Sequence, residues 1–270
     1  METKSGFLGH MTSQQTEALK ELKEIVEQSE LAEALDKHPD GDKYLLRMLR
    51  ATMKDKGRKR IFKPELAFKR LSEVLNWKAD NLEEVKTEDF QVFEKAYPNY
   101  HFHDKKQGTL VWINRIGEFT NTVKSSHLTI DKWKQCAAHQ LERAEDELRE
   151  IAGPDNEFTG YISIADVKGL GLGALTRTGI VTALSNTAAD NYPELVGKVY
   201  LINTPWIFPK IFALIKPLID KDTLSKFEIY SSTPKDRFRE LFDTKLLPQE
   251  YGGDSEFVVP YPIDSKKYKE

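Results

Sequence analysis

Cysteine is almost absent from this sequence of 270 residues, which contains Cys136 alone. A single cysteine excludes an intramolecular disulfide, and no Asn-x-Ser/Thr glycosylation acceptor occurs. The first six residues, Met-Glu-Thr-Lys-Ser-Gly, lack the apolar centre of a signal peptide. The most apolar stretch, residues 206–219, contains two lysines and two prolines and is shorter than the ~20 residues of a spanning helix. These absences predict a cytoplasmic protein.

A strong charge of either sign is also lacking. Lys and Arg total 40 against 43 Asp and Glu, which leaves a net charge of −3. Proteins that bind nucleic-acid phosphates need a basic surface, so we expect no nucleic-acid partner. The length suits one large domain or two small ones with a sizeable core.

The first third of the chain has the spacing of amphipathic helices. One apolar face begins at Leu19 behind Ser13 and Thr16, either of which is a candidate N-cap, and others include residues 44–49 and 66–77. A basic segment, residues 54–60, lies between the last two faces. It is interpreted as a solvated loop, or alternatively as a patch drawn to an anionic membrane.

The sequence pattern changes beyond residue 85, where expected strands alternate with expected helices. Strands are expected at residues 109–114, 161–167, 198–203 and 227–232, with a long amphipathic helix that includes Trp133–Leu148 and ends at Gly153. Strands separated by helices require crossover connections. The sequence therefore predicts a mixed α/β fold with a largely parallel sheet and flanking helices, preceded by an all-helical N-terminal region.

Motifs for catalysis are few. Gly169, Gly171 and Ala174 fit the G-x-G-x-x-A pattern of a dinucleotide-binding turn, but the candidate ribose partner Asp190 does not follow a second strand. A tight turn that needs glycine is the preferred interpretation. His101 and His103 lack an evident third metal ligand, and no nucleophile elbow or P-loop occurs. We therefore expect neither an enzyme nor a bound metal or cofactor.

The apolar segment 203–219 has no clean polar face if it is helical. Such a helix is either a core element or a lid over an apolar pocket. Periodicity alone favours the core, whereas the two lysines and two prolines within 206–219 favour the lid.

Several blocks of sequence, taken in order, resemble the CRAL-TRIO lipid-binding family and its phosphatidylinositol transfer branch. They are Tyr44-Leu-Leu-Arg-Met-Leu-Arg-Ala51, Asp166-Val-Lys-Gly169, Asn191-Tyr-Pro-Glu-Leu-Val-Gly-Lys-Val-Tyr-Leu-Ile-Asn-Thr-Pro205, Lys216-Pro-Leu-Ile-Asp220, Thr223-Leu-Ser-Lys226 and Leu247-Pro-Gln-Glu-Tyr-Gly-Gly253. The resemblance spans nearly the whole chain. It implies a helical region over residues 1–85, a lipid-binding domain over 86–257 and a polar tail over 258–270.

The resemblance also implies a function, the binding of phosphatidylinositol and its transfer between membranes by a monomer that visits the membrane surface transiently. A gate helix, here the segment 207–219, closes the lipid pocket. The residues expected in the gate are Ile207, Phe208, Ile211, Phe212 and Ile215, and those expected to contact the headgroup are Glu194, Lys226 and Thr223. A lipid-sensing regulator or scaffold without transfer activity is the alternative.

Two departures from the family pattern concern the ligands. The family has a phosphate-contacting Arg where Thr52 stands, so Arg60 is the expected replacement. Where the branch binds phosphatidylcholine through a Tyr, a Ser and a Thr, this sequence has His101, Tyr161 and Ser163. Because Tyr161 fills the space that a Ser leaves open, we expect the second cargo to be a sterol or another apolar molecule.

Overall fold

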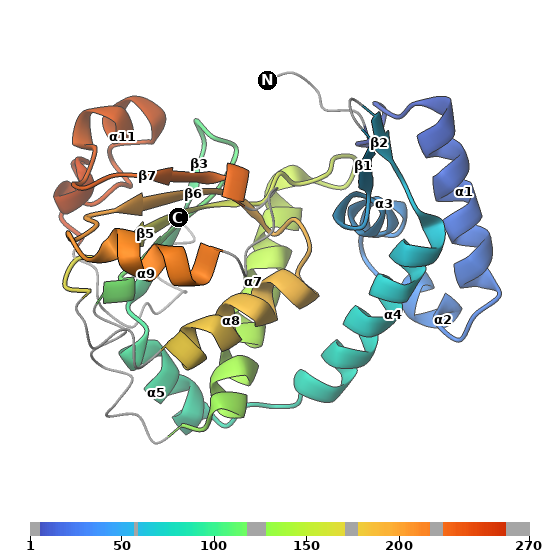
Figure 1. The fold of residues 1–270 in the computed structure, drawn as a ribbon, viewed down its shortest axis with the longest axis horizontal. Helices are drawn as coiled ribbons and strands as arrows, with labels where there is room; N and C mark the ends of the chain where they lie inside the picture. Colours follow the sequence, from blue (N-terminus) through green and yellow to red (C-terminus); the bar gives the residue numbers. More distant parts are fainter. Residues whose placement is uncertain (1–5, 57–58, 118–127, 171–177, 217–223, 258–270) are drawn as a thin grey trace.

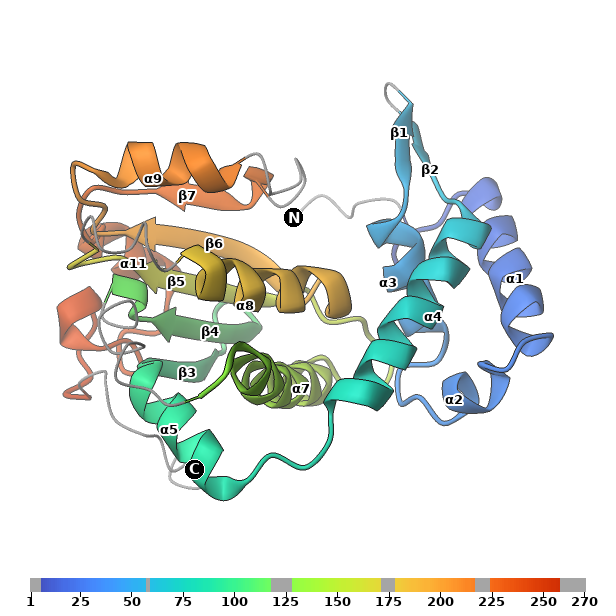
Figure 2. The same cartoon turned by 60° about the horizontal axis from the view of Figure 1, so that its bottom comes forward.

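The structure of the chain, a computed structural model, describes residues 6–56, 59–117, 128–170, 178–216 and 224–257. The N-terminal region packs four helices, α1 (Ser13–Glu27), α2 (Ala32–Asp36), α3 (Asp42–Ala51) and α4 (Pro64–Asn81), beside an α/β domain. In the described part, the α/β domain contains the helices α5 (Thr87–Ala96), α7 (Ile130–Ala152), α8 (Thr178–Asn191), α9 (Phe208–Ile215) and α11 (Lys235–Leu241). Figure 2 shows the two regions side by side, joined through the end of α4.

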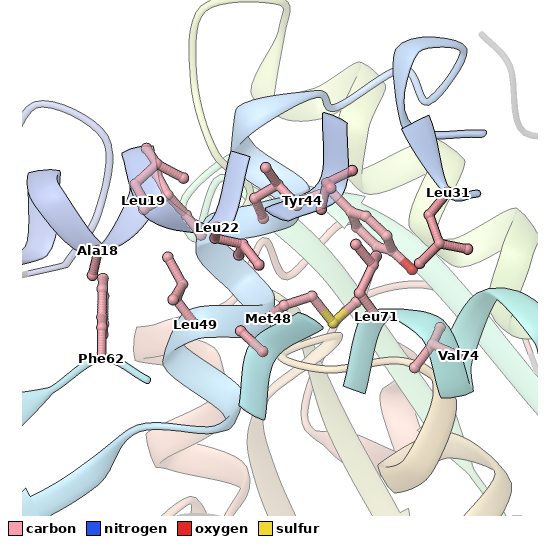
Figure 3. Close-up of a cluster of buried hydrophobic side chains, with 14 residues drawn as sticks. Ala18, Leu19, Leu22, Leu31, Tyr44, Met48, Leu49, Phe62, Leu71 and Val74 are labelled. Carbon is pink, nitrogen blue, oxygen red and sulfur yellow. The ribbon is translucent and has the colours of Figure 1, made fainter. Parts of the chain in front are cut away.

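The helices of the N-terminal region bury their apolar faces against one another, as the spacing predicts. Leu22 of α1, Met48 of α3 and Leu71 of α4 meet in one core cluster (Figure 3). The cap of α1 differs from the expectation, because Thr12 rather than Ser13 or Thr16 begins the helix. Thr12 forms a capping box with Gln15, in which each side chain bonds the other residue's backbone N–H.

The expected basic loop forms an antiparallel hairpin instead. Its strands are β1 (Lys54–Lys56) and β2 (Lys59–Ile61), which project from the helices in Figure 2. The N-terminal region is therefore not all helical. Among the residues of these short strands Ile61 alone is apolar, so no alternation of apolar and polar residues identifies them in the sequence.

A five-stranded sheet forms the centre of the α/β domain. Its strands, in order, are β3 (Asn99–Asp104), β4 (Thr109–Asn114), β5 (Tyr161–Asp166), β6 (Val196–Ile202) and β7 (Phe227–Ile229). Only β3 pairs in the antiparallel direction, which confirms the mixed, largely parallel sheet. The last strand is shorter than the expected segment 227–232.

The strand order explains where the helices lie. Parallel strands that follow one another without reversal, joined by right-handed crossovers, place every connecting helix on the same face of the sheet. One face accordingly packs against α7 through Leu110, Trp112 and Tyr161. The C-terminal segment covers the opposite face, where Ile162, Ile164 and Tyr200 meet Phe238 of α11 and Tyr251 of the 3-10 helix η4 (Gln249–Tyr251).

The Asp166-Val-Lys-Gly169 motif has a structural role at the end of β5. The Asp166 carboxylate accepts hydrogen bonds from the Lys168 backbone N–H, the Asn203 amide and the Tyr251 hydroxyl. Gly169 has a φ of 84°, a conformation that favours glycine. The motif therefore ties β5 to β6 and to the C-terminal segment. Gly171 and Ala174 lie outside the described residues.

Candidate functional site

A cavity of about 330 Å³ lies between the helix-covered face of the sheet and helices α5, α7 and α8. Most of its walls are apolar or aromatic, as in a typical ligand pocket. The residues that face it include Phe93, Tyr97, Trp112, Asn114, Ala137, Gln140, Leu141, Tyr161, Ser163, Leu184, Tyr192, Glu194, Val199, Lys226 and Phe227. The strand residues of this set follow from strand alternation. On β5, for example, Tyr161, Ser163 and Ala165 share the face that points to the cavity.

Tyr161 presents a hydroxyl to the cavity. Its ring packs against Trp112 at a centroid distance of 5.1 Å, and within the described residues the hydroxyl has no hydrogen-bond partner. Burial raises the pKa of Tyr161 above its usual range, so the hydroxyl stays protonated. Nearby, the Asn114 amide donates to the Ser163 hydroxyl across 3.4 Å. The wall near β4 and β5 therefore offers a few polar groups within an apolar surround.

Two groups of opposite charge, Glu194 and Lys226, face the same cavity. Glu194 precedes β6 and Lys226 precedes β7. Because these neighbouring strands are parallel, both residues lie at the same end of the sheet, where the two strands begin. The Lys226 ammonium donates to the Val196 carbonyl at 2.7 Å, which holds it at this end. We call the pair the Glu194–Lys226 corner. An ammonium and a carboxylate there match a phosphate and hydroxyl groups, respectively.

The backbone at this corner is constrained. Glu194 has a φ of 62°, an unusual conformation for a residue other than glycine, and such strain is often found at functional sites. A Cβ added at Gly160 would lie 2.6 Å from the Glu194 carbonyl oxygen. Gly160 is therefore needed for the close approach of the segment before β5 to the segment before β6.

Arg50 of α3, which is not among the expected site residues, bonds the Glu194 carboxylate. Its Nε donates to Glu194 at 2.7 Å, and its terminal nitrogens donate to Glu157 at 2.7 Å and to the Gly6 carbonyl at 2.9 Å. The Arg50 side chain is only 2% exposed. Burial alone lowers the pKa of Arg50, but Glu194 and Glu157 outweigh it and raise that pKa, so the guanidinium remains charged.

The segment expected to form the gate lies on the cavity side of the sheet. Ile207 and Phe208 are buried in a cluster with Val167, Leu170 and Leu201. Phe212 stacks on Phe208 at 5.5 Å and lies 6.3 Å from Phe227, which faces the cavity. The side chains of Ile211 and Ile215 are not among those the structure describes, although both residues belong to α9.

The remaining expected site residues are more distant or not described. His101 lies on β3, where it pairs with Glu147 at 3.3 Å and packs against Trp112, but it is not among the cavity-facing residues. Arg60 belongs to β2, and its side chain is not described. Thr223 lies outside the described residues. Tyr161, Ser163, Glu194 and Lys226 are thus brought together around one cavity.

The described residues contain no group of three or more His, Cys, Asp and Glu side chains that could hold a metal ion. Cys136 is buried, and burial raises the pKa of its thiol to about 11, which disfavours the reactive thiolate. Among the same residues, no helix has the length and apolar composition that crossing a membrane requires.

Comparison with known proteins adds three similarities. Residues 94–253 match the model of the CRAL/TRIO domain. The chain is 30% identical over 264 residues to the SEC14 cytosolic factor of Kluyveromyces lactis, covering 93% of this chain and 82% of the relative. It is 28% identical over 263 residues to the SEC14 cytosolic factor of Eremothecium gossypii, covering 93% and 80% of the two chains.

The fold has a solved counterpart as well. The crystal structure of Sfh5 matches with a TM-score of 0.67 at 18% sequence identity, covering 90% of this chain and 88% of that structure. At this identity the likeness concerns the fold alone, the helical region and the α/β domain together.

Proposed function

The chain belongs to the CRAL/TRIO domain family, whose relatives support lipid binding or transfer as the activity at the family level, and we propose that it carries one lipid molecule at a time between membranes. The observation that carries this proposal is the largely apolar cavity with the Glu194–Lys226 corner at one edge. Acyl chains leave water in such a cavity, at about 25 cal/mol per Å² of apolar surface buried.

Phosphatidylinositol is the proposed first cargo. The Lys226 ammonium meets the phosphate, and the Glu194 carboxylate accepts hydrogen bonds from inositol hydroxyls. Glu194 is 29% exposed, so one side of it remains reachable while Arg50 holds the other. Arg50 acts as a positioning residue, because it fixes the carboxylate through Nε and is itself fixed by Glu157. Thr223 and Arg60 remain candidates for the same headgroup.

The second cargo is proposed to be a sterol or another apolar molecule with few polar groups. Tyr161 and Ser163 supply hydroxyls to a wall that Trp112 otherwise makes apolar, and His101 packs behind Trp112. A cavity of about 330 Å³ is at the lower end of the range for ligand pockets. Loading a lipid with two acyl chains therefore requires the helices on this face to move away from the sheet.

Movement of α9 provides the proposed gate. At a bilayer the inner face of α9, with Phe208 and Phe212, exchanges its contacts with the core cluster and with Phe227 of the cavity wall for contact with lipid, so opening exposes little apolar surface to water. The proposal describes a cytoplasmic monomer, without a resident cofactor or catalysis, that associates with membranes only during exchange.

A vesicle transfer assay tests this function. Donor vesicles carry labelled phosphatidylinositol, and acceptor vesicles are separated after incubation with the purified protein. The proposal expects transfer well above the spontaneous rate. Binding of the lipid without faster transfer would instead favour the sensor or scaffold, and no effect on movement between vesicles would contradict the carrier.

A further inference from the structure

Trp206, immediately before α9, is exposed in an unusual way for its residue type. Its relative exposure is 81%, whereas the next most exposed large hydrophobic residue in the described part of the chain, Ile130, reaches 50%. Within that part, neither a hydrogen-bond acceptor for the indole N–H nor a ring partner is present. A tryptophan normally buries a large apolar area, so its exposure indicates a surface that something else covers.

The outer face of α9 continues from Trp206. Pro209, Lys210, Ala213 and Lys216 are exposed, and their spacing of three or four residues places them on one side of the helix. None of these residues is acidic, and neither lysine forms an ion pair within the described residues. We call Trp206 and these four residues the Trp206 face.

The opposite side of the same segment packs against the core beside the cavity wall. Ile207 and Phe208, directly after Trp206, are buried against Val167 and Leu201. Phe212 then contacts Phe227, a residue of the cavity wall. A partner that binds the Trp206 face therefore holds a helix that packs directly against the cavity wall.

We propose that the Trp206 face is the surface through which the protein docks on a lipid bilayer, with the Trp206 indole in the headgroup zone and Lys210 and Lys216 over anionic headgroups. Indole prefers this zone because it is largely apolar and carries one hydrogen-bond donor. Lysines near an anionic surface add attraction. This inference rests on the proposed function and adds to it the contact surface and the preferred lipid charge.

A bilayer fits the Trp206 face better than a protein partner does. The face is a single helix side with one aromatic residue, two lysines that have no ion pair within the described residues, and no acidic residue with which to orient a polar partner. Its donors and cations match a surface of phosphates, which offers acceptors in every direction.

The four tryptophans make the test direct, because Trp112 and Trp133 are buried and Trp77 is half-buried. Intrinsic fluorescence is followed as the full chain is titrated with phosphatidylcholine vesicles, with or without phosphatidylserine. The proposal expects a blue shift and protection from acrylamide with anionic vesicles, and loss of both changes in Trp206→Phe. An unchanged emission of the parent with both vesicle types would overturn it.

Vesicle sedimentation of variants adds a second readout. Trp206→Ala is expected to weaken binding on the order of tenfold, and Lys210→Glu with Lys216→Glu by about fivefold or more per lysine in anionic vesicles. The matched charge control is Lys95→Glu with Lys105→Glu, two exposed lysines away from α9. Equal weakening by the control pair, or unchanged binding of Trp206→Ala, would overturn the proposal.

Two further outcomes separate this inference from others. A blue shift that grows with protein concentration without vesicles would show that a second copy covers the face, and would overturn it. Docking through Trp206 in a protein that transfers no lipid would support it while removing the carrier function. Thermal unfolding checks that each variant folds, which the exposure of these side chains leads us to expect.

Discussion

The two halves of helix α7 have opposite surroundings. In the C-terminal half, Glu145 and Arg149 enter a buried network with Asp40 and Arg47, where opposite charges are paired. In the N-terminal half, Ala137 and Gln140 face a cavity. These pairs satisfy the buried charges and link the N-terminal region to the α/β domain. The cavity, in contrast, keeps hydrogen-bonding groups available to a ligand, as a binding site requires.

Ionisation in the charged half follows from these pairs. Burial alone raises the pKa of Glu145, but Lys78, Arg47 and Arg149 outweigh it and bring that pKa below its usual value. The same balance lowers the pKa of Asp40 beside Arg149 and Arg47. Both carboxylates are therefore charged at neutral pH, and the contact between the N-terminal region and α7 includes buried ion pairs.

The largest expected effect comes from breaking this network. Arg47→Ala leaves the carboxylates of Asp40 and Glu145 buried without their shared partner, so the free energy of unfolding falls by about 3–5 kcal/mol. Urea denaturation measures the loss. In the control, Lys20→Ala removes an exposed pair with Glu24 and changes stability by less than about 0.5 kcal/mol. Similar effects of the two variants would contradict the comparison.

The stability of the protein should also depend on pH through His38, which lies near the buried network and stacks on Tyr44 at a centroid distance of 3.9 Å. Burial lowers the pKa of His38 to about 4 from 6.5, against the opposing influence of Glu145 and Asp40. The unfolded chain therefore takes up a proton first, and stability falls as pH drops from about 6.5 to about 4.

The size of this pH effect is at most about 3 kcal/mol. Urea denaturation at several pH values should show that His38→Asn flattens the slope between pH 6.5 and 4, whereas His103→Asn, at an exposed position, leaves it in place. Equal slopes in the parent and in His38→Asn would show that other groups govern acid stability.

At the cavity, a comparison of Glu194→Gln with Glu157→Gln separates ligand binding by Glu194 from the support that Glu157 gives to Arg50. Glu194 faces the cavity, whereas Glu157 binds Arg50 from outside it. Loss of a charged hydrogen-bond acceptor is expected to weaken phosphatidylinositol binding about tenfold or more in Glu194→Gln. Glu157→Gln should instead lower stability more than binding, and the reverse pattern would place the headgroup elsewhere. Equilibrium binding and denaturation are measured on both.

The smallest expected effect compares two tyrosines of the cavity wall. The Tyr192 hydroxyl donates to the Ala138 carbonyl at 3.1 Å, whereas the Tyr161 hydroxyl has no partner in the described structure. Tyr192→Phe is expected to lose about 1 kcal/mol of stability. Tyr161→Phe should stay within about 0.5 kcal/mol of the parent. A larger loss in Tyr161→Phe than in Tyr192→Phe would show that the Tyr161 hydroxyl is bonded.

Local patterns predicted the elements that local physics decides. The apolar runs of β4, β5 and β6 and the spacing in α4 and α7 led to the right type of element near the right residues. The hairpin β1–β2 was missed because all residues of its strands except Ile61 are charged, which leaves no apolar alternation to read. The predicted cap of α1 nearest to the observed one, Ser13, is one position too late. Thr12 and Ser13 are both good caps, and only the capping box with Gln15 distinguishes Thr12.

The site depended on contacts across long separations. The resemblance placed Glu194 and Lys226 at the headgroup, and they do face one cavity. Arg50 was missed as a partner of Glu194 because 144 residues separate them and no spacing rule relates α3 to the segment before β6. The one available signal was a cationic residue within an apolar helix, since a buried Arg usually has an acidic partner.

The central claim is that the cavity holds phosphatidylinositol at the Glu194–Lys226 corner. Its most direct test is solvent extraction of the purified, cell-derived protein and mass spectrometry of the extract, for the parent and for Glu194→Ala with Lys226→Ala. The account predicts phosphatidylinositol in the parent and its loss from a double variant that remains folded. Equal phosphatidylinositol in both proteins, or a parent without lipid, would contradict it.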